Sequence, residues 1–138
     1  MNMKMNKAPL PQLRPENSLI DTHCHLDMDA YAGDLDEVVR SAAAKGVERI
    51  ITVGIDLESS IAAVAIARRF ANVWSTIGLH PHNADAAEKD TFDRLARLVE
   101  DPDNKVAGYG EIGLDYAKKY APQDAQHTAF SAQLDLAK

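Results

Sequence analysis

Hydrophobic residues follow two alternating spacings from Leu19 to the end of the sequence. Short apolar runs rich in β-branched residues are typical of buried strands. The segments between them carry an apolar residue every three or four positions, which is typical of a helix with one buried face. The pattern therefore predicts four strands, each followed by a helix, and the strands are expected at 18–22, 49–53, 73–77 and 106–111.

The predicted helices also have recognisable start and stop signals. Asp34 precedes the first helix and Glu37 follows three positions later, which predicts a capping box, while Gly46 predicts the end of that helix. Asp56 and Asp90 stand where they can cap the second and third helices. The expected buried faces are Leu35, Val38, Val39 and Ala42; Leu57, Ile61, Val64 and Ala65; Phe92, Leu95, Ala96 and Val99; and Phe130, Leu134 and Ala137.

Alternation of strands and helices predicts parallel strands joined by right-handed crossovers. An open doubly wound sheet could use four strands, whereas a closed (β/α)8 barrel needs eight strands and about 250 residues. The 138 residues, 46% of them apolar, suit one domain with a substantial core and by themselves favour the open sheet. Residues 1–18 contain three prolines and no apolar run, so we expect a flexible N-terminal tail, with neither a signal sequence nor a membrane span.

Charge and cysteine content narrow the classes of function. The net charge of −6 lacks the basic excess of proteins that bind nucleic acids non-specifically. A nucleic-acid contact would therefore need a local site, made positive by a bound metal. Cys24 is the single cysteine, which rules out an intrachain disulfide and suits a reducing cytoplasm.

The first candidate for chemistry lies at the end of the first predicted strand, in the sequence DTHCHLD. Successive side chains of a strand point to opposite faces, so His23 and His25 share a face and can bind one cation. The alternative interpretation is that the two histidines are simply polar residues at a strand end and bind no ligand. It stays open because a lone His-x-His motif is not specific for a metal site.

Two further groups of polar residues follow the third and fourth predicted strands. His80 and His82 follow the third, where a solvated turn is the alternative reading. Glu111 lies among glycines at the end of the fourth, where a buried carboxylate needs a metal, a lysine or an arginine as partner. Asp115 is expected to be a cap or a supporting group rather than a ligand. In a barrel the carboxyl ends of these strands meet around one mouth, so we expect one shared pocket.

The order and spacing of the motifs resemble those of the TatD family of metal-dependent hydrolases and deoxyribonucleases. The resemblance covers residues 19–138 and includes Gln126 and Gln133 in the last predicted helix. The motifs that carry it are DTHCHLD, TVGID, GLHPH and GEIGLDY.

The resemblance implies a TIM-type (β/α)8 barrel that binds two divalent metal ions, of Mg, Mn or Zn type. It also implies hydrolysis of DNA phosphodiester bonds by metal-activated water. Carried over residue by residue, His23 and His25 would bind the first metal, and Glu111 would bridge the two. His80 would lie near the substrate phosphate, so Glu111 and His80 are the expected catalytic residues.

The family pattern also requires histidines after strands 5 and 6 and a late aspartate, and His127, the remaining histidine, matches none of these. We therefore expect residues 19–138 to form the N-terminal half of a barrel, roughly its first four β/α units. The second metal site would be incomplete, and this form would be weakly active or inactive alone. Two alternatives stay open: an amidohydrolase acting on a small amide or ester, and a non-catalytic half-barrel that associates with itself or a partner through exposed sheet edges.

Overall fold

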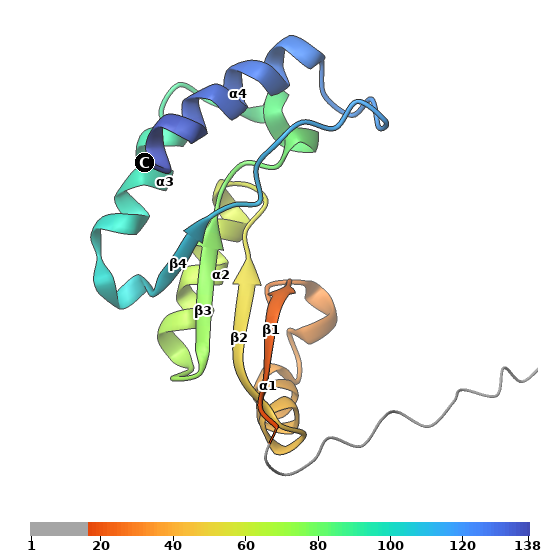
Figure 1. Cartoon of the computed structure of the whole chain (residues 1–138), viewed down its shortest axis with the longest axis vertical. Coiled ribbons are helices and arrows are strands. Elements are labelled where there is room, and N and C mark those ends of the chain that lie inside the picture. Colours follow the sequence, from red (N-terminus) through yellow and green to blue (C-terminus); the bar gives the residue numbers. More distant parts are fainter. Residues whose placement is uncertain (1–16) are drawn as a thin grey trace, which may run out of the picture.

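The structure, a computed structural model, describes residues 17–138. Its centre is one parallel sheet whose strand order is the chain order, so the first and last strands form the edges (Figure 1). This confirms the predicted parallel strands. The strands are β1 (Leu19–Cys24), β2 (Val47–Val53), β3 (Val73–Ile77) and β4 (Val106–Tyr109).

Strand boundaries differ from the prediction mainly at the two edges of the sheet. β1 continues to Cys24, and β4 ends at Tyr109, so Glu111 lies beyond the strand. The predicted flexible tail falls almost entirely on residues 1–16, which lie outside the described residues. The pairing brings the carboxyl ends of the strands level, through Cys24 with Thr52, Val53 with Thr76, and Ile77 with Tyr109.

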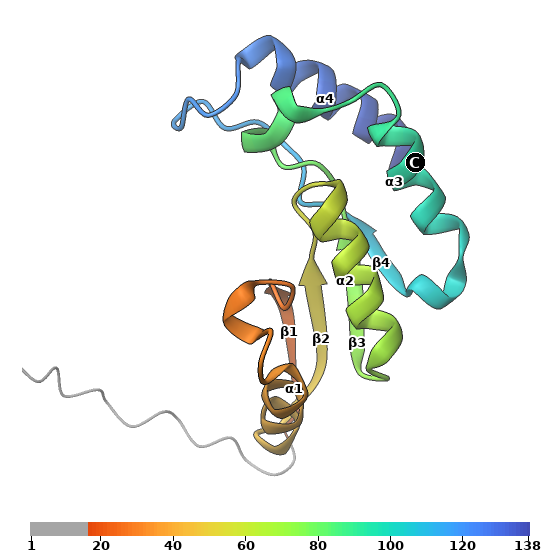
Figure 2. The same cartoon turned by 180° about the vertical axis from the view of Figure 1, so that it is seen from behind.

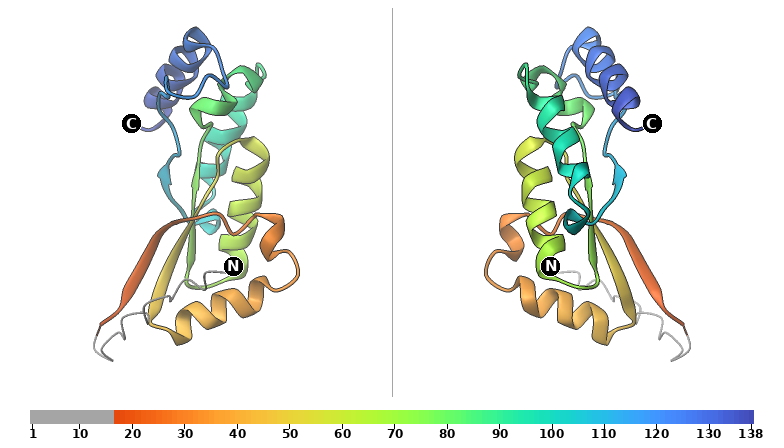
Figure 3. Two further views of the ribbon diagram at one scale, coloured as in Figure 1. Left: turned by 90° about the vertical axis from the view of Figure 1, so that its right-hand side faces the viewer. Right: turned by 90° about the vertical axis from the view of Figure 1, so that its left-hand side faces the viewer.

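The helices are α1 (Leu35–Ala44), α2 (Leu57–Arg69), α3 (Thr91–Glu100) and α4 (Gln123–Leu136). Figure 2 shows α1 and α2 in front of the sheet, and the edge-on views of Figure 3 place both on the same side of it. α4 lies beyond the carboxyl ends of the strands and packs against the short 3-10 helix η2 (Pro81–Ala86). Two further 3-10 turns are η1 (Asp29–Tyr31) and η3 (Pro102–Asn104).

The core confirms the expected face of α1 and corrects some of the expected positions in the other three helices. Val39 is buried, and Leu35, Val38 and Ala42 pack against the same cluster. α2 buries the small residues Ser60, Ala63 and Ala67 beside Val64, because they let the helix approach the sheet closely, whereas Ile61 is 43% exposed.

In α3, Leu95 is buried but Val99 is exposed. α4 buries Gln126, Ala129 and Gln133, while Leu134 and Ala137 are exposed.

Helix capping follows the sequence at one position and departs from it at another. Asp56 forms a capping box with Ser59, whose backbone N–H donates to the Asp56 carboxylate at 2.8 Å while its hydroxyl accepts from the Asp56 N–H at 3.0 Å. The prediction of a capping box at Asp34 is wrong, because the Asp34 side chain makes no cap hydrogen bond. The predicted cap at Asp90 is wrong for the same reason. Gly46 ends α1 with a φ of 92°, as predicted.

The exposure of β1 is unusual for a strand of a parallel sheet, which is normally covered on both faces. Its residues Leu19 to His23 are all exposed.

Within residues 17–138, no helix is both long and apolar enough to cross a membrane.

Candidate metal centre

His23 and His25 leave β1 on the same side, as strand alternation requires, and their ring centroids lie 5.3 Å apart. Cys24 between them faces the other way, toward the Ile51 carbonyl. The His25 Nδ1 atom lies 2.9 Å from the Val53 carbonyl oxygen. Because a carbonyl only accepts hydrogen bonds, Nδ1 carries the proton and Nε2 keeps its lone pair for a ligand. This is the usual arrangement of a metal-binding histidine.

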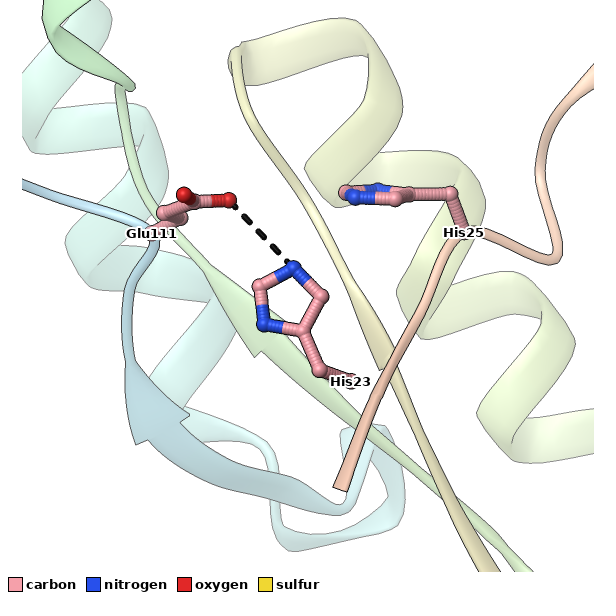
Figure 4. A group of neighbouring side chains, drawn as sticks. All are labelled: His23, His25 and Glu111. Carbon is pink, nitrogen blue, oxygen red and sulfur yellow. Dashed lines mark ion pairs between the residues drawn. The ribbon is translucent and has the colours of Figure 1, made fainter. Parts of the chain in front are cut away.

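Glu111 completes a group of three possible ligands with the two histidines (Figure 4). The His23 Nε2 atom lies 3.5 Å from the Glu111 Oε2 atom. One ligand atom from each of the three residues lies within 4.8 Å of the others. Imidazole nitrogens and a carboxylate oxygen at this spacing suit a divalent ion such as Zn²⁺ or Mn²⁺.

Glu111 reaches β1 because the chain after β4 crosses the end of β3. The Gly110 N–H donates to the Ile77 carbonyl at 2.7 Å, and the Glu111 N–H donates to the Gly54 carbonyl at 3.2 Å. Gly78 lies directly beneath this crossing. A Cβ there would lie 3.0 Å from the Gly110 carbonyl carbon and 3.3 Å from the Glu111 nitrogen. Position 78 therefore has to be glycine for the Glu111 backbone to pass this close.

His80 lies on the other side of the same carboxylate, with its Nε2 atom 3.4 Å from the Glu111 Oε1 atom. Its Nδ1 atom accepts the His82 backbone N–H at 3.1 Å, so the proton of the neutral ring is on Nε2, facing the carboxylate. Burial lowers the pKa of His80, and the Glu111 carboxylate opposes part of that effect. Both effects together leave a mainly neutral ring that donates toward Glu111.

His82 and Asp115 form a separate pair outside the group of three ligands. The His82 Nε2 atom lies 2.6 Å from the Asp115 Oδ2 atom, and this hydrogen bond lowers the pKa of Asp115. The other Asp115 oxygen accepts the backbone N–H groups of Ala117 and Lys118. Gln126 on α4 also bonds the backbone of Asp115, with its Oε1 accepting the N–H at 2.8 Å and its Nε2 donating to the carbonyl at 3.1 Å.

A cavity of about 420 Å³ adjoins the group, with His25, His80 and Glu111 in its wall. Asp27 also lines this cavity, and its Oδ1 atom is buried without a hydrogen-bond partner among the described residues. A buried carboxylate oxygen without a partner is costly. Asp27 and Glu111 place two carboxylates in this wall, and no lysine or arginine is among the described residues that line it, so the surroundings of the three ligands fit a cation.

The ion-pair alternative for Glu111 does not hold in the described part of the chain. Its nearest ionisable neighbours there are the imidazoles of His23 and His80, and no lysine or arginine of residues 17–138 pairs with it. Asp27 belongs to the DTHCHLD motif, but no role was predicted for it from the sequence. The spacing His25-x-Asp27, two residues on from His23-x-His25, is the signal that could have identified it.

Comparison with known proteins shows which family the chain resembles. The family model described as TatD related DNase matches residues 20–138. A 3'-5' ssDNA/RNA exonuclease TatD of Enterobacter lignolyticus is 38% identical over 119 residues, which are 86% of this chain and 45% of that protein. The uncharacterized metal-dependent hydrolase YabD of Bacillus subtilis is 39% identical over 122 residues, 87% of this chain and 46% of that protein.

Among solved structures, the TatD homologue YJJV of Escherichia coli K12 matches with a TM-score of 0.78 and 32% identity, covering 86% of this chain and 46% of that one. This structural match, together with the alternating strands and helices of the chain, confirms the expected barrel class, of which the chain supplies four β/α units. The chain spans about 45% of the length of the curated relatives that it matches. The extent of the family match and the motifs within it lead to one conclusion: this chain belongs to the family of TatD related DNases.

Proposed function

We propose that this chain contributes the first metal site of a divalent-metal-dependent phosphodiesterase that acts on DNA or a related nucleic acid. The observation that carries the proposal is the convergence of His23, His25 and Glu111 within 4.8 Å at the carboxyl ends of parallel strands. Sites of barrel enzymes lie at this end of the strands. The family match favours a phosphodiester over the small amide or ester of an amidohydrolase.

Each residue has a defined task in this proposal. His25 is oriented by the Val53 carbonyl, and it would hold the ion together with His23 and Glu111. A divalent ion bound there supplies positive charge to the phosphate and activates water for attack on phosphorus. His80 presents its Nε2–H beside Glu111, where it can donate to a phosphate oxygen and orient the substrate.

We further propose that Glu111 is shared between two divalent ions of Mg, Mn or Zn type. Its two oxygens face opposite sides, Oε2 toward His23 and Oε1 toward His80. Within the described residues, the only group of at least three His, Cys, Asp or Glu ligands is the one around His23. We therefore expect the 138-residue chain alone to be weakly active or inactive as a nuclease. A cytoplasmic location is proposed as well, supported by the single cysteine.

Metal content tests this function directly. The purified chain is loaded with Mn²⁺ or Zn²⁺, desalted, and analysed by inductively coupled plasma mass spectrometry. We expect the double variant His23→Ala/His25→Ala and the variant Glu111→Gln to lose bound metal. His127→Ala is the matched control, because this exposed histidine of α4 lies outside the ligand group. Equal metal content in all four proteins would contradict the proposal.

Hydrolysis of bis(p-nitrophenyl) phosphate and of a single-stranded oligonucleotide forms the second part of the test. Strong metal-dependent nuclease activity of the 138-residue chain, abolished by Glu111→Ala, would show that the second metal site needs no further ligands. Weak activity that also depends on Glu111 would support the proposal as stated.

Self-association is a second candidate function, favoured by the exposed edge strand β1. Ile20 on this strand is 54% exposed, and unpaired strand edges tend to pair with other chains. Under this proposal the chain is a dimer in analytical ultracentrifugation, and Ile20→Lys makes it a monomer. Ile61→Lys is the control, since Ile61 is 43% exposed but lies on α2. A monomeric wild type at all concentrations would exclude this candidate.

A further inference from the structure

The loop between β4 and α4 carries aromatic and basic side chains that the proposed metal chemistry does not use. Asp115, Tyr116 and residues 118–122 line a cavity of about 460 Å³ together with Gln123 and Gln126 of α4. Its wall contains Tyr116 and Tyr120, as well as Lys118 and Lys119. The two tyrosine side chains are exposed, at 45% and 65% respectively. Large aromatic rings left in solvent on a loop indicate a binding surface.

Both rings are held in place by histidines. The Tyr116 hydroxyl lies 2.6 Å from the Nε2 atom of His127 on α4. The Tyr120 ring packs edge-on against His82, with centroids 4.7 Å apart and an interplanar angle of 65°. Each ring therefore has a side-chain contact that favours one orientation while its face stays exposed.

A continuous row of rings joins this loop to the candidate metal centre. Tyr120 contacts His82, and the ring of His82 lies 4.4 Å from that of His80. His80 in turn faces the Glu111 carboxylate. A strand bound along this row would therefore lead from the loop to the metal ligands.

The loop is locally basic although the whole chain has a net charge of −6. Lys118 and Lys119 are exposed and line the cavity. Asp115 is the carboxylate in the wall, and its charge is already offset by hydrogen bonds from His82 and two backbone N–H groups. The uncompensated charge of the cavity wall is therefore positive, which suits a phosphate backbone.

We propose that residues 115–122 form a subsite for single-stranded nucleic acid, with Tyr116 and Tyr120 stacking on bases and Lys118 and Lys119 contacting phosphates. Exposed rings beside basic groups are the usual means of binding unpaired strands without sequence preference. A duplex hides its base faces, so it cannot use the tyrosines. This inference rests on the proposed function for the choice of nucleic acid as ligand, but it assigns residues outside the metal site.

Binding in the absence of metal tests the inference separately from the proposed function. A fluorescein-labelled oligothymidylate of about ten nucleotides, within the usual length bound by such surfaces, is titrated with the full chain in EDTA and followed by fluorescence anisotropy. We expect Tyr120→Ala to weaken binding about tenfold, and Tyr120→Phe to bind like the wild type because stacking needs only the ring. Lys118→Ala/Lys119→Ala should weaken binding and reduce its salt dependence, whereas the control Lys45→Ala/Lys138→Ala, which changes lysines outside the cavity wall, should not.

Three outcomes would overturn the inference: no binding by the wild type, equal binding by Tyr120→Ala, or equal binding of a duplex of the same length. An RNA oligonucleotide is the parallel probe, and similar affinity is expected because neither contact reads the 2′-hydroxyl group. Circular dichroism checks that each variant is folded. If the wild type binds no metal but still binds the oligonucleotide, the proposed function is refuted and this inference is not.

Discussion

The side-chain amide of Gln133 on α4 forms hydrogen bonds with both the N–H and the carbonyl of Leu79, 54 positions earlier in the chain. Its Oε1 atom accepts the Leu79 N–H at 2.6 Å, and its Nε2 atom donates to the Leu79 carbonyl at 3.0 Å. Leu79 lies between Gly78 and His80, so α4 holds the turn that presents His80 to Glu111. Gln126, seven residues earlier on the same helix face, holds the backbone of Asp115 in the same way.

Replacing Gln133 by leucine should destabilise the protein strongly. Gln133 is fully buried, and the change leaves the N–H and carbonyl of Leu79 without their partners. At about 1–3 kcal/mol for each buried group that loses its hydrogen bond, we expect a loss of about 2–6 kcal/mol in the free energy of unfolding. Urea denaturation measures this loss. Gln123→Leu, at an exposed position of the same helix, should change stability by less than about 0.5 kcal/mol, and an equal effect of both variants would contradict the role given to Gln133.

Replacing Gly78 by alanine should weaken metal binding more than it weakens the fold. The new Cβ would lie 2.9 Å from the Ile112 Cγ2 atom and 3.3 Å from the Glu111 nitrogen, so the Glu111 backbone has to move. Loss of groups that position metal ligands commonly costs about 10- to 100-fold in affinity. Isothermal titration with Mn²⁺ measures the change. Gly33→Ala is the control, since its Cβ would meet nothing within 4 Å, and unchanged affinity in Gly78→Ala would show that Glu111 does not depend on this crossing.

The two aspartates at helix starts should respond differently to alanine. Asp56→Ala removes a capping box and should cost about 1 kcal/mol in the free energy of unfolding. Asp34→Ala removes a side chain that makes no cap hydrogen bond and should cost less than about 0.5 kcal/mol. Thermal and urea denaturation of both variants make the comparison. A larger loss for Asp34→Ala would mean that the capping box forms where the sequence first suggested it.

The pair formed by His82 and Asp115 should make the stability of the protein depend on pH in the acid range. Hydrogen bonds from His82 and from the Lys118 backbone hold the pKa of Asp115 below its ordinary value of 3.8. A lowered pKa means that the ionised carboxylate stabilises the folded state above the ordinary value, and that this contribution disappears as the pH falls through the folded value. The Tm difference between wild type and Asp115→Asn should thus be constant above about pH 5 and shrink between about pH 4 and pH 2. Asp85→Asn, an exposed position in η2, serves as control, and a difference that grows with acid would contradict the assignment.

Local spacing was enough to determine the order of the elements and part of the site. Strand and helix periods are properties of consecutive residues, so four parallel strands, four helices and the shared face of His23 and His25 could be predicted from the sequence. The Asp56 cap could be predicted for the same reason, because its partner Ser59 is only three residues away.

The motifs already indicated Glu111 as a ligand, but only the tertiary structure decided how it reaches the histidines, because those contacts join backbone segments far apart in the chain. Glu111 meets His23 through bonds from its own segment to the ends of β2 and β3, and no local pattern encodes that crossing. α4 buries Gln133 instead of Leu134 because the turn at Leu79 offers a backbone N–H and carbonyl that need partners. Hydrophobic periodicity predicts burial from water, but it cannot predict where a buried hydrogen bond will be required.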